Sequence, residues 1–237
     1  MFYIDPLYLM LSIPPMLLAF YAQWKVTSTF KRYSQVRTGR GMTGADIAAE
    51  ILRTRNIRDV RIEPVQGTLS DHYDPTSKTL RLSPEVYSGR SVAAAGVAAH
   101  EVGHAIQHAE GYAFLKMRSN LVPVLNITSK MALPTLMIGM VMISMQSALG
   151  QPVMLAGIVL FSVMVLFQLV TLPVEFDASS RALATIRDGG IVNSQELGGA
   201  RKVLSAAALT YVAAAVSSLM TLLYFLIRSG LLGDRRD

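Results

Sequence analysis

Four long apolar segments constrain the fold of this chain more than any other feature of its sequence. None of them contains a charged residue, and each has the ~20 residues that a helix needs to cross a bilayer. The segments are Leu7–Trp24, Met131–Leu149, Val153–Leu172 and Ser205–Ile227. Only 16% of the residues are charged, well below the roughly 25% usual in soluble domains. We therefore expect a mainly α membrane protein with about four transmembrane helices.

Basic residues are distributed unevenly around the first apolar segment. The residues before it contain the acidic Asp5 and no basic residue, so a cleaved signal peptide is not expected. The positive-inside rule places residue 25 onward in the cytoplasm because a group of bases follows the segment. That group is Lys25, Lys31, Arg32, Arg37 and Arg40. The turn-like residues 150–152 predict a tight hairpin between the second and third segments. Arg228, Arg235 and Arg236 would then lie outside, which opposes this orientation.

Composition also excludes several classes of function. The net charge of +6 does not indicate nucleic-acid binding, because no run of Lys and Arg is interleaved with aromatic residues. Cysteine is absent, which excludes disulfides, thiolate metal ligands and cysteine nucleophiles. Any metal ion must therefore be held by His, Asp or Glu.

The longest polar stretch, residues 38–120, predicts a small α+β part. Thr43 is a plausible cap for a helix that carries Ile47, Ile51 and Leu52 on one face. Residues 59–63 and 78–83 alternate like short strands, with a turn-rich connection over 67–75 between them. Ser91 then caps an Ala-rich helix that runs from Val92 to His108.

This Ala-rich helix contains the motif His100-Glu101-Val102-Gly103-His104. Residues four apart on a helix lie about 40° apart around its axis and about 6 Å apart along it, so the two imidazoles can bind one zinc ion. Glu101 lies beside the pair and is suited to accept a proton from metal-bound water. Gly103 leaves the helix surface bare for a substrate or a neighbouring backbone. The alternative is that these histidines only solvate a helix face.

A catalytic zinc ion usually takes three protein ligands, so a third is required. His108 lies about 12 Å along the axis from His100, too far to share an ion with both. The best candidate is Glu175, which follows the third apolar segment, because two membrane crossings return the chain to the side it left. The alternative is that Glu175 pairs with Arg181 at the membrane interface.

Further side chains are candidates for supporting roles. Asp177 and Ser179 could accept hydrogen bonds that orient the imidazoles. His72 or Tyr73 could stabilise an oxyanion or contact substrate, although the neighbouring Asp71 and Asp74 are equally typical of a turn. Tyr211 is another possible donor, although such an aromatic residue is usually a packing or interfacial residue.

Three motifs in the same order resemble the bacterial YugP-like neutral zinc metallopeptidases. They are residues 67–75, 99–107 and 175–179, and the resemblance covers essentially the whole chain. This family is similar to the membrane gluzincins of the HtpX and CAAX-prenyl protease type, in which a Glu after the membrane segments is the third zinc ligand. The resemblance therefore implies that Glu175 is that ligand. The gluzincin pattern usually has Asp four residues later, where this chain has Ser179.

The sequence thus predicts a membrane-anchored, zinc-dependent endopeptidase of the bacterial inner membrane, multi-pass, with its active site facing the cytoplasm. The expected partners are the lipid bilayer and a protein or peptide substrate that is membrane-associated; the sequence does not define the oligomeric state. The alternative is a non-catalytic zinc-binding scaffold or quality-control partner. The expected parts are a first transmembrane helix (1–24), a zincin-like catalytic part (25–120), a transmembrane hairpin (121–172), a segment carrying the third ligand (173–204), and a fourth transmembrane helix with tail (205–237).

Overall fold

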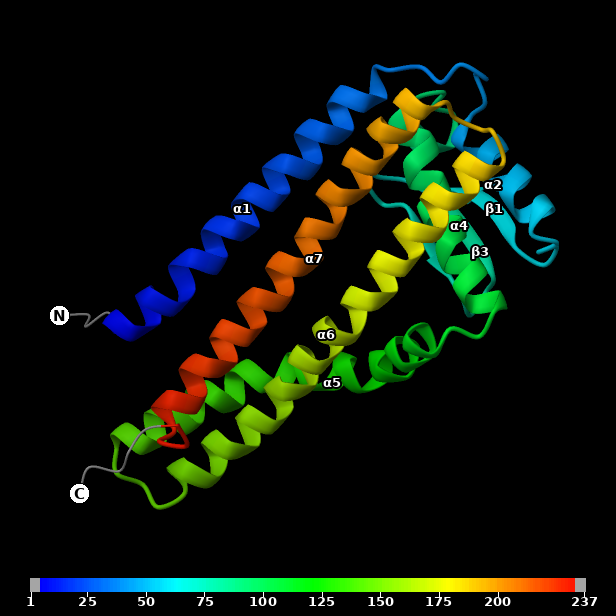
Figure 1. Ribbon diagram of the computed structural model, residues 1–237. Helices are drawn as coiled ribbons and strands as arrows, with labels where there is room; N and C mark the ends of the chain where they lie inside the picture. Colours follow the sequence, from blue (N-terminus) through cyan, green and yellow to red (C-terminus); the bar gives the residue numbers. More distant parts are fainter. Residues whose placement is uncertain (1–4, 233–237) are drawn as a thin grey trace. The chain divides into compact units, whose positions relative to one another are not determined.

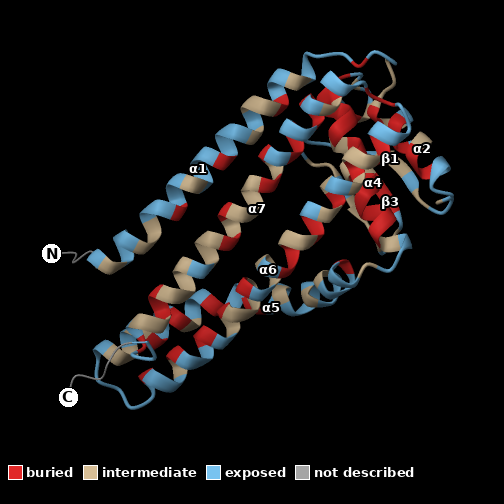
Figure 2. Ribbon diagram, in the orientation of Figure 1, coloured by how far each residue is buried: buried red, intermediate tan, exposed pale blue. Residues whose placement is uncertain are grey.

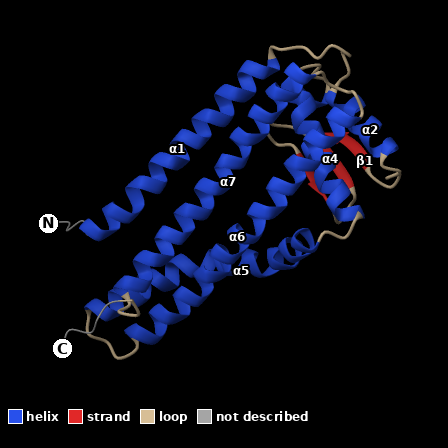
Figure 3. Cartoon of the chain, viewed as in Figure 1, coloured by secondary structure: helices blue, strands red, loops and turns tan. Residues whose placement is uncertain are grey.

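The computed structural model describes residues 5–232 and is mainly helical (Figures 1 and 3). Its elements are α1 (Pro6–Ser34), α2 (Gly44–Thr54), β1 (Arg61–Pro64), β2 (His72–Asp74), β3 (Thr79–Leu82), α3 (Pro84–Tyr87), α4 (Val92–Ala109), α5 (Ala113–Ser144), α6 (Gly150–Asp188) and α7 (Ser194–Arg228). The chain forms two compact units. Of the described residues, the first comprises 5–21, 117–171 and 211–232, and the second comprises 22–116 and 172–210.

Helices α1, α5, α6 and α7 are each long and apolar enough to cross a membrane. Large apolar side chains on them are exposed, including Phe20 (67%), Ile127 (63%) and Val159 (66%). Such exposure is unfavourable in water but suits contact with lipid. The expectation of a mainly α membrane protein with about four transmembrane helices is confirmed.

The hairpin of the first unit turns earlier than the sequence predicts. Helix α5 ends at Ser144 and α6 already begins at Gly150, so the turn lies at residues 145–149. The expectation of a turn at 150–152 was wrong because proline is tolerated in the first turn of a helix, where its missing N–H has no partner to lose. The two helices approach closely at Gly139, where an added Cβ would lie 2.6 Å from the backbone nitrogen of Met154.

Helix α6 also extends much further than its apolar segment. Pro173 lies inside it without ending it, and the helix continues to Asp188. Prolines are tolerated in membrane helices when neighbouring groups satisfy the freed carbonyl. The predicted third ligand, Glu175, therefore lies on the same continuous helix as the third apolar segment.

The second unit contains the small sheet and α4. The sheet has the order β1-β3-β2, with β1 parallel and β2 antiparallel to β3. The predicted strands correspond to β1 and β3, whereas β2 lies in the segment expected to be a turn-rich connection. The caps are formed as expected: Thr43 and Asp46 make a capping box, and the hydroxyl of Ser91 accepts a hydrogen bond from the N–H of Ala94.

Helix α4 is buried along most of its length because small residues let other helices approach it (Figure 2). The closest approach is at Gly103, where an added Cβ would lie 2.5 Å from the carbonyl oxygen of Ala178 on α6. The bare surface predicted at Gly103 is therefore filled by a neighbouring backbone. This contact places the Glu175 segment of α6 against the histidines of α4.

Candidate metal centre

The side chains of His100 and His104 on α4 and of Glu175 on α6 converge on one point. Their ligand atoms all lie within 4.8 Å of one another. One carboxylate oxygen, Glu175 Oε2, lies 3.2 Å from His100 Nε2 and 3.6 Å from His104 Nε2. The imidazole rings are nearly perpendicular, at 82°. The structure thus brings together the three residues that the sequence predicts as metal ligands.

Each histidine also has a partner on the ring nitrogen that faces away from Glu175. Ser179 Oγ lies 3.1 Å from His100 Nδ1. The amide oxygen of Gln107 lies 3.0 Å from His104 Nδ1. Such partners fix the orientation of a metal-binding imidazole and increase its basicity.

Gln107 is the important residue that the sequence analysis did not single out. Its side chain is fully buried, and its amide nitrogen donates to the carbonyl of Val174 (2.8 Å) and to the carboxylate of Asp177 (2.7 Å). Because both of these groups are acceptors, the amide oxygen must face His104. That oxygen can only accept, so His104 Nδ1 carries a proton. In the neutral imidazole that a metal ion requires, Nε2 then has the lone pair, and it is directed at Glu175.

Asp177 therefore acts on His104 through Gln107 and does not touch an imidazole directly. Its carboxylate also accepts a hydrogen bond from Arg181 Nε at 2.5 Å, and Arg181 pairs in addition with Glu110. Arg181 is thus engaged by Asp177 and Glu110, and the pairing with Glu175 considered from the sequence is not formed. A signal for Gln107 was present: a polar residue one turn after His104 in a helix that is otherwise rich in Ala.

Glu101 is next to the cluster and nearly buried, with 7% of its surface exposed. The pKa of Glu101 is raised to about 7, chiefly by burial and also by the nearby carboxylates of Glu175 and Asp71, although the charge of His100 lowers it. A hydrogen bond from the backbone N–H of Tyr73 lowers the same pKa. A carboxyl group with such a pKa is suited to both accepting and returning a proton near neutral pH.

Comparison with known proteins identifies the family. A family model described as "Putative neutral zinc metallopeptidase" matches residues 8–230. The chain belongs to this family. It is also 50% identical over 221 residues to "Putative membrane protease YugP" of Bacillus subtilis (strain 168), which covers 93% of this chain and 96% of that protein. No solved structure matches the chain.

The donor set of this zinc metallopeptidase family member fits a zinc ion. Two ligand atoms that are each ~2.1 Å from a tetrahedral ion lie ~3.4 Å apart, close to the 3.2 and 3.6 Å separations at Glu175 Oε2. In the neutral imidazole with its proton on Nδ1, the lone pair of His104 Nε2 faces a carboxylate, and a metal ion between these two acceptors would stabilise the arrangement. Nitrogen and carboxylate oxygen are also the ligands that zinc accepts when thiolates are absent.

The remaining predicted residues lie around β2. His72 is exposed, and its Nδ1 lies 2.8 Å from the carbonyl oxygen of Ser70. The hydroxyl of Tyr73 lies 2.8 Å from Nδ1 of His108, so this histidine is engaged by Tyr73 and does not belong to the cluster. Burial, with Asp59 and Asp74 nearby, raises the pKa of Tyr73 to about 12, so this hydroxyl keeps its proton at neutral pH.

The two acidic residues that flank His72 and Tyr73 shape the local backbone. Asp71 accepts hydrogen bonds from the N–H and hydroxyl of Ser83, and Asp74 accepts one from the N–H of Thr76. Tyr211, the other aromatic residue considered as a donor, belongs to the first compact unit, whereas the cluster belongs to the second.

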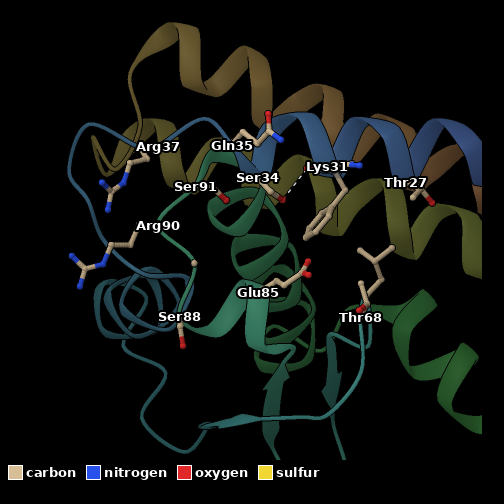
Figure 4. Close-up of a pocket in the computed structure, with 13 residues that line it drawn as sticks. Thr27, Lys31, Ser34, Gln35, Arg37, Thr68, Glu85, Ser88, Arg90 and Ser91 are labelled. Carbon is tan, nitrogen blue, oxygen red and sulfur yellow. Dashed lines mark hydrogen bonds between the residues drawn. The ribbon is translucent and has the colours of Figure 1, made fainter.

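A cavity of about 750 Å³ is lined by other residues than those of the cluster. It lies at the N-terminal end of α4, where Ser91 lines it. Ser91 is about 13 Å from His100 along the helix axis. Figure 4 shows Lys31, Arg37, Arg90 and the carboxylate of Glu85 around it.

Proposed function

We propose that this chain is a membrane-anchored, zinc-dependent endopeptidase in which Glu101 is the general base. The observation that carries the proposal is the convergence of His100, His104 and Glu175 with Glu101 beside them. Membership of a zinc metallopeptidase family and the similarity to a protein named as a membrane protease support it.

His100, His104 and Glu175 would hold the zinc ion. When bound, zinc supplies Lewis-acid activation of the scissile carbonyl and of the attacking water. Glu101 takes the proton from that water and returns it to the leaving amine. Ser179 and Gln107 hold the two imidazoles in place, and Asp177 holds the amide of Gln107.

Strand β2 is the proposed binding edge for a peptide substrate. Within the described strands it pairs only with β3, and the N–H of Tyr73 points to Glu101. The open edge of β2 thus borders the general base. An extended peptide that paired with this edge would present its carbonyl groups to the cluster. His72 and Tyr73 are the proposed contacts for the substrate or the oxyanion.

The proposed location is the bacterial inner membrane, with the cluster on the cytoplasmic side. The bases that follow the first apolar segment, from Lys25 to Arg40, support this orientation. Protein substrates that are anchored in or close to the membrane would then reach β2 without crossing the bilayer.

The test compares the purified, zinc-loaded protein in detergent with Glu101→Gln, using casein and a membrane protein as substrates. Zinc content is measured for both. We expect both proteins to bind zinc and the variant to cleave about 10²- to 10⁴-fold more slowly. Cleavage by the variant at the normal rate would exclude Glu101 as the base.

The second candidate function is a non-catalytic zinc-binding scaffold. A structural zinc site is usually closed by four protein ligands, whereas the described cluster contains three. His72, the residue that could have closed it, is directed at Ser70. If both proteins bind zinc and neither cleaves any substrate, the scaffold is the better explanation.

A further inference from the structure

A second site lies in a groove between the end of α1 and the start of α7, within the second unit. The groove encloses a cavity of about 360 Å³, within the size range of pockets that hold small ligands. Four basic side chains line it and no acidic one does; they are Lys25, Arg32, Arg201 and Lys202. From this groove we infer a binding site for the phosphate-bearing headgroup of an anionic phospholipid.

The four cations have no competing carboxylates. Within residues 5–232 none of them forms an ion pair, in contrast to bases such as Lys78 and Arg181, which are paired with Asp59 and Glu110. All four are exposed at the rim of the groove. Like charges gathered on two helices repel one another, so an anion that binds among them is attracted by the whole group.

The groove is shaped by close packing of the two helices. An added Cβ at Gly199 on α7 would lie 2.8 Å from the ring of Tyr33 on α1, so glycine permits this contact. The guanidinium of Arg32 lies over the same ring, 5.7 Å from its centroid. Tyr33 thus fixes both the separation of the helices and the position of one cation.

A neighbouring cavity of about 530 Å³ shares Arg32, Tyr33 and Lys202 with the groove and adds Arg37. Its one acidic residue is Glu196. The carboxylate oxygens of Glu196 accept hydrogen bonds from the backbone N–H groups of Gly39 (2.7 Å) and Asn193 (2.8 Å). This carboxylate is therefore engaged with the backbone.

The position of the groove along the helices selects a lipid as the source of the phosphate. The uncharged segment of α1 ends at Trp24, directly before Lys25, and that of α7 begins at Ser205, three residues after Lys202. The cations thus lie at the level where apolar helix meets headgroups, and basic pockets between membrane helices at this level bind anionic headgroups. The large cavity of Figure 4 is less suited, because Glu85 contributes a carboxylate to its lining.

The test uses Trp24, the sole tryptophan of the chain, as a probe next to the groove. The full-length protein in neutral detergent is titrated with short-chain phosphatidylglycerol, with phosphatidylcholine of the same chain length, and with inorganic phosphate. Tryptophan fluorescence is the readout. We expect saturable binding of phosphatidylglycerol that weakens with added salt, and no saturable response to phosphatidylcholine.

The variant is Arg32→Gln combined with Lys202→Gln, and the control is Arg40→Gln combined with Arg58→Gln, two exposed bases outside the groove. Both pairs lower the net charge by the same amount. Each base near an anionic lipid accounts for about fivefold in affinity, so the variant should bind phosphatidylglycerol about 30-fold more weakly. The control should bind like the unmodified protein.

Three outcomes would overturn the inference. Equal binding of the two lipids by the unmodified protein would exclude headgroup recognition, and this comparison needs no variant. An equal loss in the control would show that only net charge matters. Inorganic phosphate that binds as tightly as the lipid would assign the groove to a free anion.

Discussion

Replacement of Gln107 by Met tests whether a buried amide determines zinc affinity. Met has a similar volume and no amide, so three hydrogen bonds disappear. Val174 still has its helical hydrogen-bond partner and Asp177 keeps Arg181. The group left without a partner is the Nδ1–H of His104. An unsatisfied buried donor costs about 1–3 kcal/mol, and loss of such a partner weakens zinc binding by about 10- to 100-fold.

The assay is competition for zinc between the protein and a chromophoric chelator, together with thermal unfolding of the metal-free protein. Gln151→Met is the matched control, because it removes an amide-to-carbonyl hydrogen bond, to Ser229, in the other compact unit. We expect the control to keep normal zinc affinity. If Gln107→Met lowers the stability of the metal-free protein but binds zinc within about twofold of normal, Gln107 supports packing alone and the reasoning on His104 is refuted.

Two further predictions follow from close contacts and from topology. Gly103→Ala should destabilise the protein by about 1–3 kcal/mol, because its Cβ would meet the Ala178 carbonyl. Gly198 is a helical position with open space around it, so Gly198→Ala should instead stabilise the protein by about 0.5–1 kcal/mol. Unfolding of both variants in detergent decides whether the two changes in stability differ in sign. Because the chain has no cysteine, Ser147→Cys and Arg58→Cys each introduce a single thiol. In intact cells a membrane-impermeant maleimide should label the thiol at position 147, and it should reach the thiol at position 58 only after permeabilisation. The reverse labelling pattern would show that the orientation in the membrane is opposite to the proposed one.

Much of this fold could be predicted because its signals are local. Four uncharged segments of membrane-spanning length predict four long helices, and a spacing of four on a helix predicts that two imidazoles share a face. The position of Glu175 beside the two histidines could be predicted as well, because an even number of membrane crossings would return the chain to its starting side.

What could not be predicted depends on contacts between distant segments. Strand β2 has three residues, and it is a strand because Tyr73 pairs with Leu80 of β3. The role of Gln107 depends on Val174 and Asp177, about seventy residues away in the sequence. The course of α6 through Pro173 was hidden for a different reason, because proline usually indicates the end of a helix in water.

The continuity of α6 places a constraint on how this protein can vary. The helix runs without interruption from Gly150 past Glu175, and each residue advances a helix by about 100° of rotation. Glu175 and Ser179 both contact His100 from this helix, so one residue inserted or deleted between them would turn one of the two side chains away from the imidazole. The spacing of these two residues is therefore expected to stay fixed, and any change in helix length that adapts the protein to a thicker or thinner bilayer is expected in the part of α6 that precedes Glu175.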